Sequence, residues 1–284
     1  MTKRIKRVLT PHADPIQLGG TLTRDARKNR PAIGLGAAGA AAAAIAAAAF
    51  PASAATIPLT WLDMAPVPIN TPVPNNSAYF MPGLGNVTIT YNIPSFINHL
   101  HGTNAIFQNG NVVSGPDTYT WGAHQYFGAT NLGSTNPDGT PSVGAPWSIT
   151  YTFPSTVAAN QIYLGIAGLG RTLNAGGIES TATVNQNGTF LGDFISGQNW
   201  GATDFIPGAG TFTLRNTQTG LGGADPWWNT ELALVQINDS LNSLTVDFWH
   251  LPGDGLFVNI AYVPAPGAFA LLAAGGLMAT RRRR

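Results

Sequence analysis

Two adjacent tryptophans offer the clearest ligand-binding chemistry in this chain. Trp227 and Trp228 lie in a turn-rich segment with Asp225 and Asn229 beside them. Adjacent side chains of an extended chain point in opposite directions, so one indole can be buried while the other faces solvent. An exposed indole can stack on a sugar ring, and the carboxylate and the amide can bond its hydroxyls. The segment therefore predicts a sugar-binding site; the alternative is that both tryptophans only fill the core.

Two histidines are candidate metal ligands. His99 and His101 are separated by one residue, so in an extended strand both imidazoles would project from one face and could chelate zinc or copper. A zinc site needs a third ligand held by further partners, and the sequence does not place His124 or His250 beside the pair. The alternative is that these are solvated or core-edge histidines.

No cofactor is indicated by a motif. The turns at residues 136–139 (Asn-Pro-Asp-Gly) and 252–255 (Pro-Gly-Asp-Gly) carry oxygen ligands, but neither has the spaced carboxylates of an EF-hand loop. Ordinary turn chemistry accounts for both. A structural calcium ion assembled from distant loops remains an alternative.

The sequence contains no catalytic motif of the hydrolase, zinc-protease or phosphate-loop types. Its two glutamates, Glu179 and Glu231, could be matched with several aspartates, and the two carboxylates of a glycosidase must lie at a set separation. We therefore name no catalytic residue and predict a protein that is not an enzyme. A polysaccharide-cleaving enzyme is the second alternative.

Residues 56–262 are predicted to form one domain. Short β-type runs alternate there with Gly, Asn and Pro turns, and no long amphipathic helix pattern interrupts them. The expected strands are Val87–Tyr91, Tyr119–Trp121, Ser148–Phe153, Ile162–Leu164, Thr181–Val184, Thr189–Leu191, Thr211–Leu214, Leu232–Ile237, Leu244–Phe248 and Leu256–Tyr262.

This pattern predicts an all-β fold, an antiparallel β-sandwich of jelly-roll type. Asn187-Gly188, between two of the runs, predicts a tight hairpin. Trp121, Trp147 and Trp249 lie within strand-like runs and are expected in the core. Cysteine is absent, so stability must come from burial rather than from disulfides.

Residues 1–55 have the organisation of a cleavable secretory signal helix with a long basic n-region. Eight Lys and Arg residues precede residue 31, and a run of Ala and Gly follows. Ala52, Ala54 and Ala55 supply the small residues of a signal-peptidase site, which places the mature terminus near Ala55 or Thr56. The alternative, a nucleic-acid-binding arm, would explain the basic residues alone.

Residues 263–284 form a tail of three parts. A Pro/Gly turn holds Pro264, Ala265 and Pro266; an apolar run from Ala268 to Ala279 follows; and the tail ends in four arginines, which are Arg281, Arg282, Arg283 and Arg284. A helix of twelve residues reaches only about 18 Å of a roughly 30 Å hydrocarbon core. The run therefore predicts a short C-terminal hydrophobic helix, and an ordinary membrane anchor is one interpretation of it.

The tail resembles the sorting signal of the PEP-CTERM proteins, which are exported bacterial proteins. The family's motif has glutamate between two prolines, and Ala265 stands at that position. The resemblance implies export through the membrane, processing by an exosortase-like transpeptidase, and a bacterium that makes exopolysaccharide.

Charge narrows the partners of the mature domain. Residues 56–264 contain two arginines, no lysine and eleven acidic residues, which gives a net charge of −9. Such a domain is a poor partner for nucleic acid or anionic lipid. Together with the signal-peptide pattern, the resemblance of the tail implies an exported protein of the bacterial cell envelope, outer surface or extracellular matrix, at least transiently membrane-anchored, for which we predict a structural or adhesive role. The first alternative is a carbohydrate-binding module that recognises exopolysaccharide.

Overall fold

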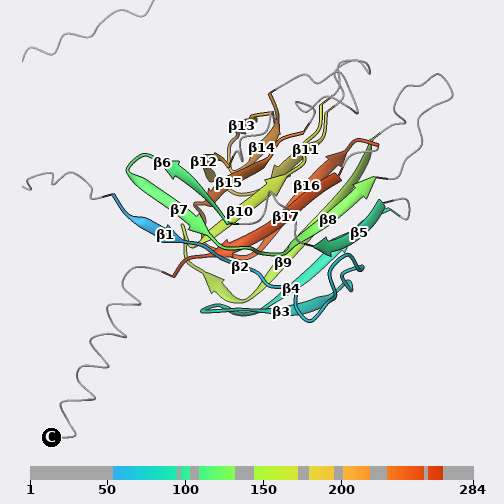
Figure 1. The fold of residues 1–284 in the computed structure, drawn as a ribbon, viewed down its shortest axis with the longest axis horizontal. Coiled ribbons are helices and arrows are strands. Elements are labelled where there is room, and N and C mark those ends of the chain that lie inside the picture. The colour runs from blue at the N-terminus through green and yellow to red at the C-terminus, as the bar shows by residue number, and fades with distance from the viewer. Residues whose placement is uncertain are drawn as a thin grey trace, which may run out of the picture. The chain divides into compact units, whose positions relative to one another are not determined.

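The computed structural model describes residues 54–94, 97–102, 109–131, 144–171, 179–194, 201–217, 229–252 and 255–264. All of them belong to one unit, Phe50–Arg284. Within these ranges every regular element is a β-strand, and the ladders are antiparallel with one exception (Figure 1). The prediction of an all-β, antiparallel fold is confirmed. The predicted signal helix and the predicted C-terminal helix lie outside the described residues.

Seven strands form what we call the open sheet, in the order β13-β14-β11-β16-β9-β4-β3. Their side chains alternate between buried and accessible, which is the pattern of a sheet with one face on the core and one in solvent. The strands are β3 (Ser77–Met81), β4 (Gly85–Asn92), β9 (Ala145–Val157), β11 (Thr181–Val184), β13 (Thr203–Pro207), β14 (Phe212–Asn216) and β16 (Leu241–His250).

A second seven-stranded sheet, the central sheet, has the order β12-β15-β10-β17-β8-β5, and β2 pairs with one end of β17. Its strands are β2 (Thr60–Trp61), β5 (Ile97–Gly102), β8 (Tyr126–Asn131), β10 (Ile162–Ala167), β12 (Gly188–Phe194), β15 (Leu232–Ile237) and β17 (Gly255–Tyr262).

The small sheet has the order β1-β7-β6. The hairpin of β6 (Gly110–Ser114) and β7 (Asp117–Trp121) is antiparallel, whereas β1 (Thr56–Pro58) joins β7 as a parallel edge strand. The chain segment that precedes β2 is thereby tied to the middle of the sequence.

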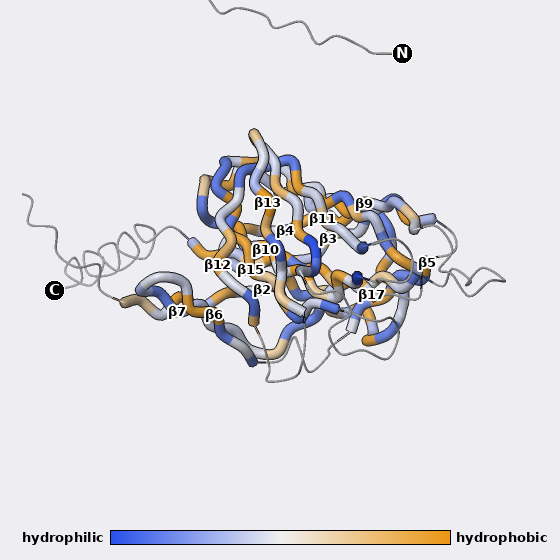
Figure 2. The backbone as a smooth tube through the Cα atoms, turned by 90° about the horizontal axis from the view of Figure 1, so that it is seen from above, coloured by the Kyte–Doolittle hydropathy of each residue, from blue (hydrophilic) through white to orange (hydrophobic). Residues whose placement is uncertain are grey.

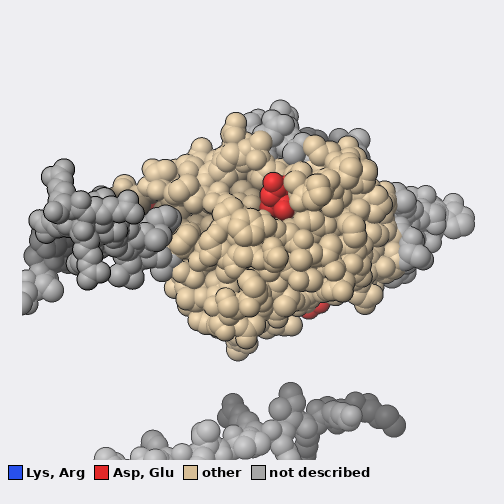
Figure 3. Space-filling view, turned by 90° about the horizontal axis from the view of Figure 1, so that it is seen from below, with Lys and Arg blue, Asp and Glu red and all other residues tan. Residues whose placement is uncertain are grey.

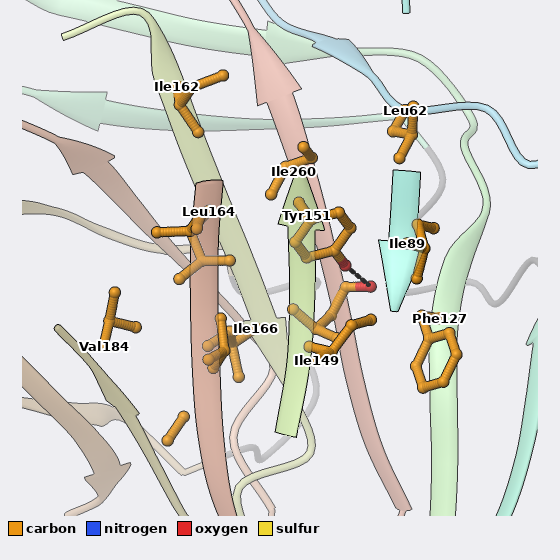
Figure 4. Close-up of a cluster of buried hydrophobic side chains, with 14 of the residues drawn as sticks. Leu62, Ile89, Phe127, Ile149, Tyr151, Ile162, Leu164, Ile166, Val184 and Ile260 are labelled. Carbon is orange, nitrogen blue, oxygen red and sulfur yellow. Dashed lines mark hydrogen bonds between the residues drawn. The ribbon is translucent and has the colours of Figure 1, made fainter. Parts of the chain in front are cut away.

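The main core lies between the open and the central sheet. Ile89 and Ile149 of the open sheet pack in one buried cluster with Leu164 and Ile260 of the central sheet (Figure 4). The hydroxyl of Tyr151 lies 3.5 Å from the carbonyl oxygen of Val258 on the opposite sheet. The two sheets therefore form a β-sandwich-like pair of layers.

A second core covers the other face of the central sheet. Tyr119 and Trp121 of the small sheet, with Trp61 of β2, pack there against Tyr163 and Leu234. Because both of its faces are buried, the central sheet needs apolar residues at consecutive positions rather than at alternate ones. This explains why every residue of β10 is buried, and Figure 2 shows orange segments around the labels β10 and β15.

The predicted hairpin at Asn187-Gly188 is wrong. The run before it is β11 of the open sheet and the run after it is β12 of the central sheet, so the two are not paired with each other. A type I′ turn needs positive φ at both central residues, and neither Asn187 nor Gly188 has it. Instead, the Asn187 amide nitrogen donates to Asp239, in the connection from β15 to β16.

Candidate functional site

The solvent face of the open sheet gathers hydroxyl groups in rows that follow the strand register. Thr90 pairs with Thr150 and Thr150 with Thr245, whose Oγ1 atom lies 2.8 Å from that of Thr150. In a neighbouring region Thr183 pairs with Thr213, with 3.1 Å between their Oγ1 atoms. Cross-strand hydroxyl pairs of this kind fix the side-chain rotamers and leave an ordered, uncharged polar surface.

Trp249 stands on this same face and is 38% exposed. It lies on β16 in register with Pro146 on one side and Thr181 on the other, and Asp247 is two residues away on the same strand. A Cβ atom at Gly144 would lie 2.6 Å from the indole Nε1 atom, so only glycine lets the ring rest against the backbone there. We call Trp249, Asp247, Thr181, Thr183 and Arg215 the binding face.

The expectation that Trp249 belongs to the core is therefore wrong, whereas Trp121 and Trp147 are buried as predicted. The alternation of residues along β16 is enough to predict that Trp249 is exposed. Leu244, Val246 and Phe248 alternate with Thr245, Asp247 and Trp249. Since Thr and Asp share the tryptophan's side of the strand, the alternation points that side to solvent.

An ion-pair network adjoins the binding face. Arg215 Nε donates to Asp204 Oδ2 at 2.8 Å, and Arg215 Nη1 lies 3.3 Å from Glu179 Oε1. Arg171 Nε is 3.5 Å from the other oxygen of the same glutamate. The hydrogen bond that Arg215 donates to Asp204 and the charge of Glu179 raise the pKa of Arg215. The two arginines of the described residues are thus held by carboxylates at this edge.

The rest of the described surface carries few charges. In the view of Figure 3 isolated acidic side chains interrupt an uncharged surface, and no Lys or Arg atom is visible. Among the described ranges there are eight acidic residues for two arginines. Outside the ion-pair network, the described surface is therefore mostly uncharged.

Neither a protein-family model, nor a curated protein, nor a solved structure matches this chain.

The sugar site predicted around Trp227 and Trp228 lies mainly outside the described residues, as does Asp225. Asn229 is described: it forms a backbone bridge with Gly170, and its carbonyl oxygen accepts a hydrogen bond from the Gly201 nitrogen at 2.9 Å. Its side-chain Oδ1 atom is buried and has no hydrogen-bond partner among the described residues.

The two candidate metal ligands occupy alternate positions of β5, as the spacing predicted, and each makes a contact of its own. His99 Nε2 lies 2.7 Å from the hydroxyl of Tyr91, and His101 Nε2 lies 2.6 Å from the carbonyl oxygen of Val67. Burial lowers the pKa of His99, which keeps its imidazole neutral. No group of three His, Asp or Glu residues suited to a metal ion occurs in the described part of the chain.

Most residues of the predicted processing signals are not described. Ala52, Ala265, Pro266 and the arginines from Arg281 to Arg284 lie outside the described ranges; Ala54, Ala55 and Pro264 lie within them. In the described ranges no helix has the length and apolar character needed to cross a membrane, and the predicted signal and tail helices lie outside those ranges. The sorting and cleavage predictions stay predictions.

Proposed function

We propose that the protein is an exported, non-enzymatic carbohydrate-binding protein of the bacterial cell surface or extracellular matrix, and that its ligand is a neutral polysaccharide. One observation carries the proposal: an exposed tryptophan lies on the outer face of a sheet that also carries cross-strand pairs of threonine hydroxyls. The indole of Trp249 would stack on a sugar ring, while Asp247 and Thr181 would bond its hydroxyls.

The length of the face suits a polymer. Trp249, Thr181 and Arg215 occupy three neighbouring strands in one register row. Strands are spaced about 4.8 Å apart, which is close to the length of one sugar ring. Successive sugar units would therefore meet successive strands.

The net negative charge of the domain favours a neutral polysaccharide over an anionic one. The mature domain has a net charge of −9 and no lysine, so a polyanionic chain would be repelled at long range. A neutral chain meets no such penalty, and the ion-paired Arg215 remains able to donate from its guanidinium.

A binding role is favoured over a hydrolytic one by the carboxylates at the site. A retaining or inverting glycosidase needs two carboxyl groups at a set separation, one of them free to give up a proton. Asp204 and Glu179 are instead both engaged by Arg215, so neither carboxyl group is free to face a ligand alone. The Asp247 carboxylate is left as a hydrogen-bond acceptor.

We further propose that the fold is a jelly roll. The central sheet contains the order β15-β10-β17-β8, and the open sheet contains β14-β11-β16-β9. We letter these eight strands B to I in chain order, starting with β8 as B and ending with β17 as I. Read from β8, the central sheet then has the order B-I-D-G, and read from β9, the open sheet has the order C-H-E-F. These are the strand orders of a two-sheet Greek-key sandwich. The strands β12 and β13 then form an insertion that widens both sheets.

Retention on solid polysaccharide tests the binding proposal. The exported protein is incubated with cellulose, chitin or an insoluble β-1,3-glucan, and the bound fraction is measured. Trp249→Ala should weaken binding at least about tenfold, because an aromatic anchor typically contributes more than 1.4 kcal/mol. Phe80→Ala is the matched control, since Phe80 is an exposed aromatic on the far edge strand β3.

Equal retention of the wild type and Trp249→Ala on every polymer, or no retention of the wild type, contradicts the proposal. Release of reducing ends from any polymer would favour the enzyme instead.

The export and sorting part of the proposal rests on the two ends of the chain. Signal peptidase and an exosortase-like enzyme would be its processing partners, and the PEP-CTERM-like tail would hold the protein at the membrane until it is cut. Mass spectrometry of both termini in the native host tests this: loss of residues 268–284 supports processing, whereas an intact tail in the membrane fraction supports a plain anchor.

A further inference from the structure

A cavity of about 500 Å³ lies between two segments that are distant in the sequence. One wall is Leu59–Asp63, which includes β2, and the other is Gly122–Gln125, which connects β7 to β8; Pro82 also lines it. None of these residues belongs to the binding face. Small-molecule sites in proteins have volumes of roughly 300–1,000 Å³, so the cavity has the size of a ligand site.

A buried amide ties the two walls together. Asn259 of β17 is 1% exposed, and its Nδ2 atom donates to the carbonyl oxygens of Leu62 at 3.0 Å and Gln125 at 2.6 Å. The Gln125 side chain adds a third link, because its Oε1 atom accepts from the Met64 nitrogen at 2.9 Å. The cavity is thus formed in advance, which spares a ligand the entropic cost of ordering it.

A pair of stacked rings forms part of the lining. The rings of Trp61 and His124 are nearly parallel, 8° apart, with 4.4 Å between their centroids. Below them, Gly165 makes room for the indole, since a Cβ atom there would lie 2.5 Å from the ring. Burial lowers the pKa of His124 to about 4, so the imidazole is neutral at physiological pH.

The cavity has an amphipathic lining with a single charge. Asp63 is the only acidic side chain in the lining, and its Oδ1 atom accepts a hydrogen bond from the Ala65 nitrogen at 3.0 Å. Thr60 is exposed and contributes a hydroxyl, while Pro82 and Ala123 contribute exposed apolar surface. Nothing in this lining balances an anion. A sugar has the complementary surface, with hydroxyls at its edge and C–H groups on its faces.

We propose that this cavity is a second binding site, which takes one or two units of a neutral sugar between Asp63, Thr60 and the apolar surface of Pro82 and Ala123. The inference rests on the proposed function for its ligand class, but it depends on different residues. The binding face would hold the polymer along its length, and the cavity would hold a short unit of it.

Calorimetric titration with soluble sugars tests the cavity separately. Because the binding face could also bind them, the background is Trp249→Ala, and the probes are glucose, galactose, N-acetylglucosamine, cellobiose and maltose. At least one probe should bind at millimolar or lower concentration. Ala123→Phe, which fills the cavity, and Asp63→Asn should each weaken that binding at least fivefold, whereas Ala158→Phe places the same bulk on an exposed turn and should leave it unchanged.

Absence of binding by every probe overturns the inference, as does equal binding by Trp249→Ala with and without Ala123→Phe. Neither result touches the proposed function, because retention on solid polysaccharide by the chain with an intact Trp249 is measured independently. Conversely, soluble sugar binding that requires Ala123 and survives loss of Trp249 supports the cavity even where polymer retention fails.

Discussion

The backbone nitrogen of Ala55 lies 3.2 Å from Oδ1 of Asp117, at the point where the first described strand joins the small sheet. A second hydrogen bond joins the same two segments, because the Thr118 nitrogen donates to the Ala55 carbonyl oxygen at 2.8 Å. Ala55 is also the first residue after the predicted cleavage site Ala52-Ser53-Ala54.

Cleavage after Ala54 is therefore predicted to strengthen the join between β1 and β7. Hydrolysis would turn the Ala55 amide into an ammonium group, and the hydrogen bond to Asp117 would become charge-assisted. Asp117→Asn should lower the Tm of the mature protein by at most about 4 °C, since exposed pairs contribute less than about 1 kcal/mol. The difference should shrink in 1 M salt, which screens such pairs. Terminal sequencing that finds a start other than Ala55, or a salt-independent difference, contradicts this.

A methyl group at position 144 should disable the binding face. Gly144→Ala places a Cβ atom 2.6 Å from Trp249 Nε1 and 3.0 Å from the His250 carbonyl oxygen, so the indole must leave its position against the backbone. We expect several-fold weaker polysaccharide retention and a stability loss of about 1–3 kcal/mol, measured by chemical denaturation. Gly255→Ala is the control, because the nearest atom to its added Cβ, in the ring of Phe257, lies at an ordinary contact distance of 3.4 Å. Unchanged retention in Gly144→Ala would remove Trp249 from the site.

Stability should fall in acid through His124. The unfolded chain takes up a proton there near pH 6.5, whereas burial lowers the pKa in the folded state to about 4. Between these two pKa values the folded state binds fewer protons than the unfolded chain. The contribution of the neutral His124 to the free energy of unfolding is therefore complete above pH 6.5 and is lost as the pH falls toward 4. The loss amounts to at most about 3 kcal/mol. His124→Gln should flatten the pH dependence of the unfolding free energy between pH 6.5 and 4, and an unchanged slope would speak against a buried neutral imidazole.

Asn259 is predicted to be the most sensitive single position of the cavity walls. Asn259→Leu keeps the volume but leaves the carbonyl groups of Leu62 and Gln125 without their donor. Buried unsatisfied acceptors cost about 3 kcal/mol together, which corresponds to a Tm lower by roughly 6–12 °C. Asn242→Leu serves as the control, since Asn242 is exposed and its side chain bonds only Thr156 among the described contacts. Equal effects of the two substitutions would mean that the amide does not hold the walls.

Local alternation was enough to find most strands but not their partners. The predicted runs Thr181–Val184 and Leu232–Ile237 coincide with β11 and β15. Period-two burial is a property of neighbouring residues, so it is visible in sequence. The strands β1 and β13 were not predicted because proline and polar residues weaken the alternation in them, and β3 was not predicted because its apolar residues are consecutive rather than alternate.

The sequence by itself determined the all-β fold class and the net charge of residues 56–264, because composition and alternation are local properties. Only the tertiary structure decided that Asn187-Gly188 passes between sheets and that the central sheet is buried on both faces. It also decided that Leu59–Asp63 and Gly122–Gln125 enclose a cavity. Those features depend on contacts such as that of Asn259 with Leu62, which join residues far apart in the chain. The spacing of residues within one strand does not indicate which distant carbonyl group will accept a hydrogen bond from a buried amide such as that of Asn259.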